Sequence, residues 1–245
     1  MQNISNLSDI CERLGELKTG IEQACQRSRR ASSEISILAI SKRQPIEVIK
    51  TAYACGIRNF GENYVQEAMQ KIEQLSDYDD IYWAMVGHIQ SNKAQAVAQT
   101  FSSVHSLDSL KLAQSLNKNR PEQLPPLDVF IEVNLAGEES KTGFPAQHRE
   151  DWEKLIPIVE KIQTLEKLNL KGLMAMPPLF DETEQVRPYF TRLRELRDFL
   201  NSQISGKKLL ELSAGTSSDF EIAIEEGATV IRIGERLLGP RNYSR

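Results

Sequence analysis

The segment ISILAISK at residues 35–42 is a mostly apolar run that ends in a lysine. Such a run predicts a buried β-strand. The ammonium group of Lys42 would then lie beside an apolar core, where desolvation disfavours the charged form and lowers the pKa. A lysine with a lowered pKa is a nucleophile that can form a Schiff base with an aldehyde. A solvated lysine at a strand end is the simpler interpretation, so the rest of the chain must decide between the two.

Similar apolar segments follow along the chain, and helical patterns lie between them. The predicted strands are 35–41, 57–60, 81–86, 102–107, 127–134, 170–176, 209–213 and 228–233. The predicted helices are 45–55, 63–75, 90–99, 108–119, 151–166, 186–201 and 219–226. Mostly apolar strands that alternate with helices indicate a parallel sheet covered on both faces. Eight such strands in 245 residues favour an α/β fold with a single closed (β/α)8 TIM barrel, and an open doubly wound sheet is the alternative.

One more helix is predicted before the first strand. Apolar residues recur there at spacings of three and four, which marks one helix face: Ile10, Leu14, Leu17, Ile21 and Ala24. We expect residues 1–34 to pack on the barrel. Because no interdomain linker is evident, we expect residues 1–245 to form one domain.

Composition and charge exclude several classes of partner. Hydrophobic residues make up 40% and charged residues 26% of the chain, as in ordinary globular proteins, and the net charge of −4 argues against nucleic acid. No secretory signal and no membrane-length apolar run is present. Three cysteines without C-x-x-C spacing predict neither a disulfide framework nor a zinc site. We therefore expect a protein of the reducing cytoplasm, without metal or membrane partners.

Small and hydroxyl-bearing residues follow the seventh predicted strand, before a helix that we expect to start near Asp219. They are Ser213, Gly215, Thr216, Ser217 and Ser218. Small residues let a phosphate group approach backbone N–H groups, and a helix N-terminus adds further donors. Gly234 follows the eighth strand, and the loops after strands seven and eight form the usual phosphate site of such barrels. Simple helix capping by Ser218 or Asp219 does not account for the whole run.

Two other polar residues have more than one interpretation. Arg232 lies near the end of the eighth strand and must be paired if it is buried. Its partner could be a carboxylate such as Glu211, or a ligand nitrogen. His88 is either an acid–base group or, more simply, a histidine hydrogen-bonded at a helix entry. No two histidines have metal-ligand spacing, so no zinc site is predicted.

Taken together, six motifs are similar to those of the pyridoxal phosphate homeostasis protein family. They are ISK at 40–42 with Pro45, FGENYVQE at 60–67, GHIQSNK at 87–93, GLMAM at 172–176, the segment 212–220, and VIRIG at 230–234. The resemblance implies a barrel like the N-terminal domain of alanine racemase. It also implies pyridoxal 5'-phosphate (PLP) on Lys42 as an internal aldimine.

The resemblance assigns roles to further residues. It implies phosphate contacts from Ser213, from the loop Gly215–Thr216–Ser217 and from Gly234. Arg232 would face the pyridine nitrogen, and Asn63 would lie near the ring. Three positions depart from the family pattern. Ala214 and Thr216 stand where methionine is frequent, and Glu235 stands where many relatives have serine or threonine. A carboxylate aimed at phosphate would be repulsive, so we expect Glu235 to point away.

The family is regarded as PLP carriers or regulators of vitamin B6 and amino-acid homeostasis, without established turnover. The residues favour the same view. A charged Arg232 beside the pyridine nitrogen disfavours its protonation, which weakens PLP as an electron sink. Racemisation also needs a second acid–base group, which alanine racemase takes from a further domain and its dimer partner.

Two alternatives stay open. Tyr64 or His88 could supply the second acid–base group, so a PLP-dependent racemase-like enzyme is the first. A phosphate-handling barrel enzyme without PLP is the second. We expect a monomer whose protein partners are PLP-dependent apoenzymes or a regulatory protein.

Overall fold

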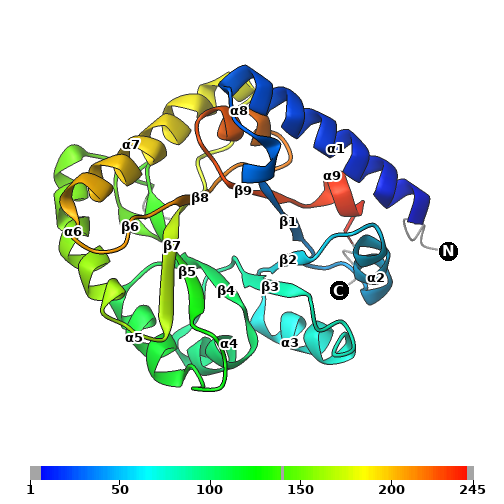
Figure 1. The fold of residues 1–245 in the computed structure, drawn as a ribbon, viewed down its shortest axis with the longest axis horizontal. Helices are drawn as coiled ribbons and strands as arrows, with labels where there is room; N and C mark the ends of the chain where they lie inside the picture. Colours follow the sequence, from blue (N-terminus) through cyan, green and yellow to red (C-terminus); the bar gives the residue numbers. More distant parts are fainter. Residues whose placement is uncertain (1–6, 139–140, 242–245) are drawn as a thin grey trace.

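The computed structural model describes residues 7–138 and 141–241 (Figure 1). Eight parallel strands form a ring: β1 (Ser36–Ile40), β2 (Asn59–Glu62), β3 (Tyr82–Met85), β4 (Ser103–Leu107), β5 (Leu127–Asn134), β7 (Leu168–Ala175), β8 (Glu211–Ser213) and β9 (Val230–Ile233). The first strand pairs with the last, and β4 pairs with β5, with Val104 opposite Val129. These pairings close the sheet into the predicted TIM barrel and exclude the open doubly wound alternative.

Helices surround the ring on its outer side (Figure 1). They are α1 (Leu7–Ser28), α2 (Ile46–Ala54), α3 (Val65–Gln74), α4 (Ala94–Thr100), α5 (Leu110–Asn119), α6 (Arg149–Gln163), α7 (Arg187–Gln203), α8 (Phe220–Glu225) and α9 (Glu235–Leu238). Short 3-10 turns are η1 (Ser32–Glu34), η2 (Ser91–Lys93) and η3 (Thr183–Val186). The sequence pattern did not predict α9 or the two-residue strand β6 (Phe144–Pro145), because both are too short to show periodicity.

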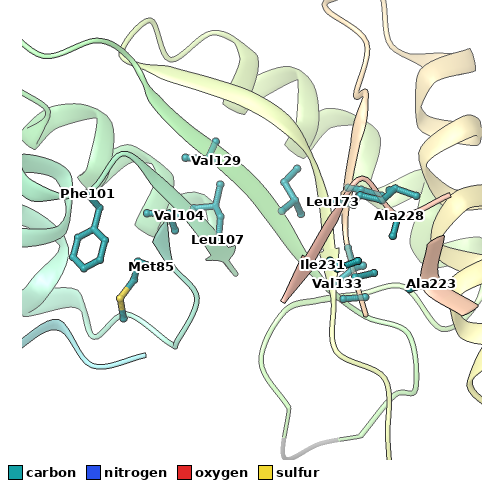
Figure 2. Close-up of a cluster of buried hydrophobic side chains, with 14 of the residues drawn as sticks. Met85, Phe101, Val104, Leu107, Val129, Val133, Leu173, Ala223, Ala228 and Ile231 are labelled. Carbon is teal, nitrogen blue, oxygen red and sulfur yellow. The ribbon is translucent and has the colours of Figure 1, made fainter. Parts of the chain in front are cut away.

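The apolar side chains form two layers, one on each side of the ring. The larger layer lies between strands and helices, and Figure 2 shows part of it, with Val104, Leu107 and Val129 from neighbouring strands. The smaller layer fills the barrel interior with Leu38, Ile40, Ala84, Phe130, Met174 and Val230. Strands buried on both faces are the reason that the sequence shows continuous apolar runs.

The N-terminal helix lies beside α8 on the outside of the barrel (Figure 1). Arg27 near its end forms ion pairs with Glu221 and Glu225 of α8. No helix in the described part of the chain is long and apolar enough to cross a membrane.

The prediction of no disulfide is wrong. Cys11 of α1 and Cys55 at the end of α2 are joined, with their Cα atoms 5.3 Å apart, and Cys25 is a buried free thiol. The sequence separation of 44 between Cys11 and Cys55 hid the pair from a search for short cysteine spacings. The cysteines therefore lend no support to the expected reducing cytoplasm, which stays a prediction.

Candidate functional site

A cavity of about 340 Å³ opens at the carboxyl ends of β1 and β9, beside the loop after β8. Its lining includes six of the eight predicted site residues: Lys42, Asn63, Thr216, Ser217, Arg232 and Gly234. Gly215 lines an adjacent cavity, and Ser213 lines neither. Carboxyl ends of barrel strands are where active and binding sites of this fold are built. The volume lies within the range of roughly 300–1,000 Å³ that small-molecule sites occupy.

Lys42 sits in the turn between β1 and α2 and is half-buried. Burial is the main cause that lowers the pKa of Lys42, and the positive charges of Arg241 and Arg43 lower the pKa further. The carboxylates of Glu62 and Glu235 oppose this shift. The direction confirms the effect predicted from the apolar strand end, so the amine is a better nucleophile than that of an ordinary surface lysine.

The cavity lining carries a surplus of positive charge. Among the described residues, Lys42, Arg232, Arg236 and Arg241 contribute cations, and Glu235 contributes the only carboxylate. Arg236 and Arg241 were missed in the sequence, because neither belongs to a local motif and only α9 brings them back to the cavity. Such a lining favours an anionic ligand.

Glu235 lies on the cavity wall, although we expected it to point away from bound phosphate. Its carboxylate pairs with Nε of Arg241 at 3.4 Å, and its side chain is 46% exposed. The guanidinium offsets the repulsion that the carboxylate would exert on an anion.

Arg232 is buried, and backbone carbonyls together with one hydroxyl hold it in place. Its Nη1 donates to the carbonyl and Oγ of Ser213 at 2.7 and 3.0 Å, and its Nη2 donates to the Ala175 carbonyl at 2.9 Å. Glu211, the carboxylate partner considered from the sequence, instead pairs with Lys171 at 2.9 Å. Burial lowers the pKa of Arg232 to about 10, so the group stays charged at neutral pH.

The unused donors of Arg232 are available to a ligand. A guanidinium has five N–H bonds, and three are used by Ser213 and Ala175. The Nε–H and one Nη2–H have no partner among the described residues. Because Arg232 lines the cavity, these donors can serve an acceptor atom bound there.

Ser213 lies beneath the cavity and is fully buried. Its Oγ accepts from Arg232 and lies 2.8 Å from Nδ1 of His105, a contact that no sequence motif predicted. Burial lowers the pKa of His105 to about 3, so the ring is neutral. The tautomer of His105 decides which of the two groups donates in this contact, and in either case Ser213 accepts from Arg232 and is placed to orient it.

The loop after β8 approaches the cavity closely. Gly215 has φ of +89°, and a Cβ there would lie 2.6 Å from the Cβ of Ala223, so a larger residue would push α8 away. Asp219 accepts hydrogen bonds from the backbone N–H and the hydroxyl of Thr216, at 2.5 and 2.9 Å. Its carboxylate thus shapes the loop, and no side-chain hydrogen bond from Asp219 caps α8.

Asn63 follows β2, and a glycine allows the neighbouring strand to approach it. A Cβ at Gly87 would lie 2.3 Å from the Asn63 carbonyl oxygen. Only glycine therefore fits at position 87, which explains the first residue of the GHIQSNK motif. This close approach fixes the backbone from which Asn63 reaches the cavity.

A second cavity of about 410 Å³ adjoins the first and shares Met176, Thr216 and Arg232 with it. Its wall includes Lys141, which donates to the Met176 carbonyl at 3.1 Å and pairs with Glu138 at 2.9 Å. Lys141 therefore lies on the wall of an adjoining cavity, where it could compete with Lys42 for an aldehyde.

The two residues considered as a second acid–base group do not line either cavity. Tyr64 is 47% exposed, and its ring lies under the Arg43 guanidinium. The His88 side chain is 53% exposed and lies 3.0 Å from Asp108, so the simpler interpretation of a hydrogen-bonded histidine describes it. Within the described ranges, no three His, Cys, Asp or Glu residues are grouped to hold a metal ion.

Comparison with known proteins gives the same fold and one family. The model of the alanine racemase N-terminal domain family matches residues 19–242. The pyridoxal phosphate homeostasis protein of Pseudomonas aeruginosa is 41% identical over 237 residues, which cover 97% of this chain and 98% of that protein. The protein of the same name from Aquifex aeolicus is 42% identical over 235 residues, covering 96% and 100%.

Solved structures show the same barrel fold. PipY of Synechococcus elongatus, solved with PLP bound, has a TM-score of 0.80 and 34% identity, covering 94% of this chain and 100% of PipY. Alanine racemase of Clostridium difficile has a TM-score of 0.69 and 15% identity, and the match covers 98% of this chain but 58% of the racemase, so it shows the fold alone. The chain therefore has an alanine racemase N-terminal-domain barrel and belongs to the pyridoxal phosphate homeostasis protein family.

Proposed function

We propose that this protein binds PLP, holds it as an aldimine on Lys42, and acts in intracellular PLP and amino-acid homeostasis without catalytic turnover. One observation carries the proposal: a lysine with a lowered pKa shares one cavity with the guanidinium groups of Arg232, Arg236 and Arg241. An amine nucleophile beside anion-binding groups suits a phosphorylated aldehyde. The relative PipY, solved with PLP bound, supports the choice of that aldehyde.

The residues present fit the groups of PLP. Thr216, Ser217 and Gly234 form the wall near Arg236 and Arg241, which suits a phosphate. The unused donors of Arg232 suit the pyridine nitrogen, and a cationic donor there keeps that nitrogen unprotonated. Asn63 lies on the same wall as Lys42, so it is the residue we place near the ring.

The absence of turnover rests on what surrounds Lys42. PLP supplies an electron sink at its ring, and racemisation needs one acid–base group on each side of the substrate Cα. Lys42 can act on one side, whereas Tyr64 and His88 lie off the cavity. A PLP-dependent racemase-like enzyme is the alternative function. It predicts rapid exchange of the Cα proton when L-amino acids are incubated with the protein in deuterated water.

The test uses borohydride reduction of the PLP-loaded protein, followed by peptide mapping. We expect a visible absorbance band that reduction removes, and a pyridoxyl group on Lys42. A pyridoxyl group mainly on Lys141 or Lys93 would overturn the assignment. A protein that binds phosphate without any visible band would support a PLP-free barrel enzyme instead.

We also propose a cytoplasmic monomer that exchanges PLP with apoenzymes or a regulatory protein. Light scattering over a concentration series tests the monomer. A dimer that persists on dilution would contradict it.

A further inference from the structure

Beneath Lys42 lies a buried group of charges that the proposed function does not use. Lys71 of α3 is 6% exposed, and Glu62 at the end of β2 is fully buried. Nζ of Lys71 lies 2.7 Å from Oε1 of Glu62 and 2.6 Å from Oε1 of Glu67. Burying charges is unfavourable even when they are paired, so such a group is weak evidence for a role in stability.

The same group holds the backbone on both sides of Lys42. Nζ of Lys71 donates to the Ser41 carbonyl at 2.6 Å, and the Ser41 hydroxyl donates to Glu62 at 2.7 Å. On the other side, the Arg43 N–H donates to Glu67 at 2.5 Å. Arg43 has φ of +57°, a left-handed conformation that is strained for a residue with a side chain. The contact with Glu67 stabilises this turn.

The group also acts on the charge of Lys42. The carboxylates of Glu62 and Glu235 favour the ammonium form of Lys42. The positive charges of Arg241 and Arg43 disfavour it. Oε2 of Glu62 is buried and has no hydrogen-bond partner among the described residues. Lys71 is the cation that directly compensates Glu62. Burial raises the pKa of Glu62 and Lys71 opposes this shift, so without Lys71 the buried carboxyl would take up a proton and would no longer favour the ammonium form of Lys42.

We propose that Lys71, Glu62 and Glu67 form a clamp that fixes the Ser41–Arg43 turn, and that Lys71 keeps the buried Glu62 carboxylate of this clamp ionised. The three are positioning residues that act through Lys42. The inference deepens the proposed function, in which the neutral amine attacks the aldehyde carbon, a C–N bond forms, and the carbonyl oxygen leaves as water. Neutral amine is the reactant, so a charge that favours the ammonium slows this step.

The first experiment measures the Lys42 amine without PLP. Acetic anhydride acetylates neutral amines, and peptide mapping gives the rate at Lys42 against pH. We expect Glu62→Gln to move the midpoint to lower pH, and we expect Lys71→Met to move it in the same direction, because Glu62 becomes neutral when its cation is removed. Lys171→Met, which breaks a separate ion pair with Glu211, is the matched control and should leave the midpoint in place. Lys71→Met with an unchanged or raised midpoint overturns the proposal.

The double variant Glu62→Gln/Lys71→Met replaces Lys71→Met in this test if that single variant does not fold. It removes both charges together and so leaves no unpaired charge in the interior. Since Lys71 acts through Glu62, the double variant should match Glu62→Gln. A midpoint above that of the parent protein overturns the proposal. Failure of PLP to bind Lys42 would overturn the proposed function, yet these midpoints would still be measurable.

Glu67→Met tests the positional half of the clamp. We expect the visible absorbance of the PLP adduct to appear about tenfold to a hundredfold more slowly, because a small misplacement of a reacting group has a large effect on rate. Affinity for 4'-deoxypyridoxine 5'-phosphate, which lacks the aldehyde, should be unchanged. An unchanged rate of adduct formation would contradict the positional role of Glu67. An affinity for the aldehyde-free analogue that falls as much as the rate would contradict it as well.

Discussion

The two ends of the barrel use charge in opposite ways. At the carboxyl end, four cations and one carboxylate line the cavity. At the amino end, a smaller cavity of about 190 Å³ is lined by groups that satisfy one another. Tyr82 donates to Asp128 at 2.8 Å, Asn169 donates to the same carboxylate at 2.5 Å, and Lys171 pairs with Glu211 at 2.9 Å. Both ends contain polar cavities, so a cavity alone does not identify a site.

The two ends differ in how many of their charges and hydrogen-bond donors lack a partner within the described structure. At the amino end the carboxylates and the lysine are paired within the protein, whereas at the carboxyl end Arg232 keeps two donors without a partner in the described structure. A ligand at the carboxyl end would supply the missing charge and acceptors. Surplus charge and unused donors, more than the presence of a cavity, therefore indicate a binding site.

The largest effect should come from Lys42. Lys42→Ala removes the amine, so we expect complete loss of the reducible covalent adduct, while weak binding of PLP through its phosphate persists. Lys171→Ala, at the other end, should keep the full adduct. Absorbance before and after borohydride measures both. If Lys42→Ala formed the covalent adduct in the same yield as the parent protein, Lys42 would not be the residue that PLP modifies.

His105 lies between the two ends, and its effect should appear in stability at low pH. The folded pKa is about 3, below the usual value near 6.5, so the unfolded state binds more protons between these pH values. The stabilisation that depends on a neutral His105 is fully present above about pH 6.5. The free energy of unfolding then decreases as the pH falls, by up to about 3 kcal/mol at pH 4.

Urea unfolding of the parent and His105→Gln at a series of pH values tests this assignment. The free energy of unfolding of the variant should fall less steeply below pH 6.5, whatever its value at pH 7. Parallel slopes for the two proteins would show that His105 is protonated in the folded state.

Arg232→Ala should weaken PLP binding about tenfold to a hundredfold, because a charge-assisted hydrogen bond is worth roughly 1.5–3 kcal/mol. Arg120 provides a matched control, since it is also buried and donates to the carbonyls of Ala98, Phe101 and Pro125. Arg120→Ala should lower the melting temperature and leave PLP affinity unchanged. Equal PLP affinity in Arg232→Ala and the parent would make Arg232 a purely structural residue.

The smallest effect should come from the ion pair at the amino end. The side chains of Lys171 and Glu211 are 31% and 29% exposed, and partly exposed pairs of this kind contribute less than about 1 kcal/mol. Lys171→Met should therefore change the free energy of unfolding little and leave PLP affinity within about twofold. A clear loss of PLP affinity in Lys171→Met would mean that the ion pair at the amino end influences ligand binding at the carboxyl end.

Much of the fold could be predicted because the strands are buried on both faces. The strand 127–134 was predicted with the bounds observed for β5. The second strand was placed at 57–60, whereas β2 covers Asn59–Glu62. The error arose at Glu62, since a charged residue indicates solvent, and its burial depends on Lys71 from the following helix.

The residues that line the cavity could be predicted where they follow a strand directly, as Lys42, Asn63 and Gly234 do. They were missed where tertiary structure decides. Arg236 and Arg241 reach the cavity through α9, and the partner of Arg232 is a hydroxyl and carbonyls where a carboxylate was considered. Sequence spacing shows which residues end a strand, but hydrogen-bond partners depend on neighbours far along the chain.

The pairing of β1 with β9 also fixes when the site can form during synthesis. Lys42 is made early, whereas the cavity residues from Thr216 to Arg241 emerge about 170 residues later. At roughly 5–20 residues per second, that interval is about 10–30 s. Throughout it, the lysine has neither its cationic neighbours nor the last strand beside it. The complete cavity therefore exists only after the last strand and α9 have been made.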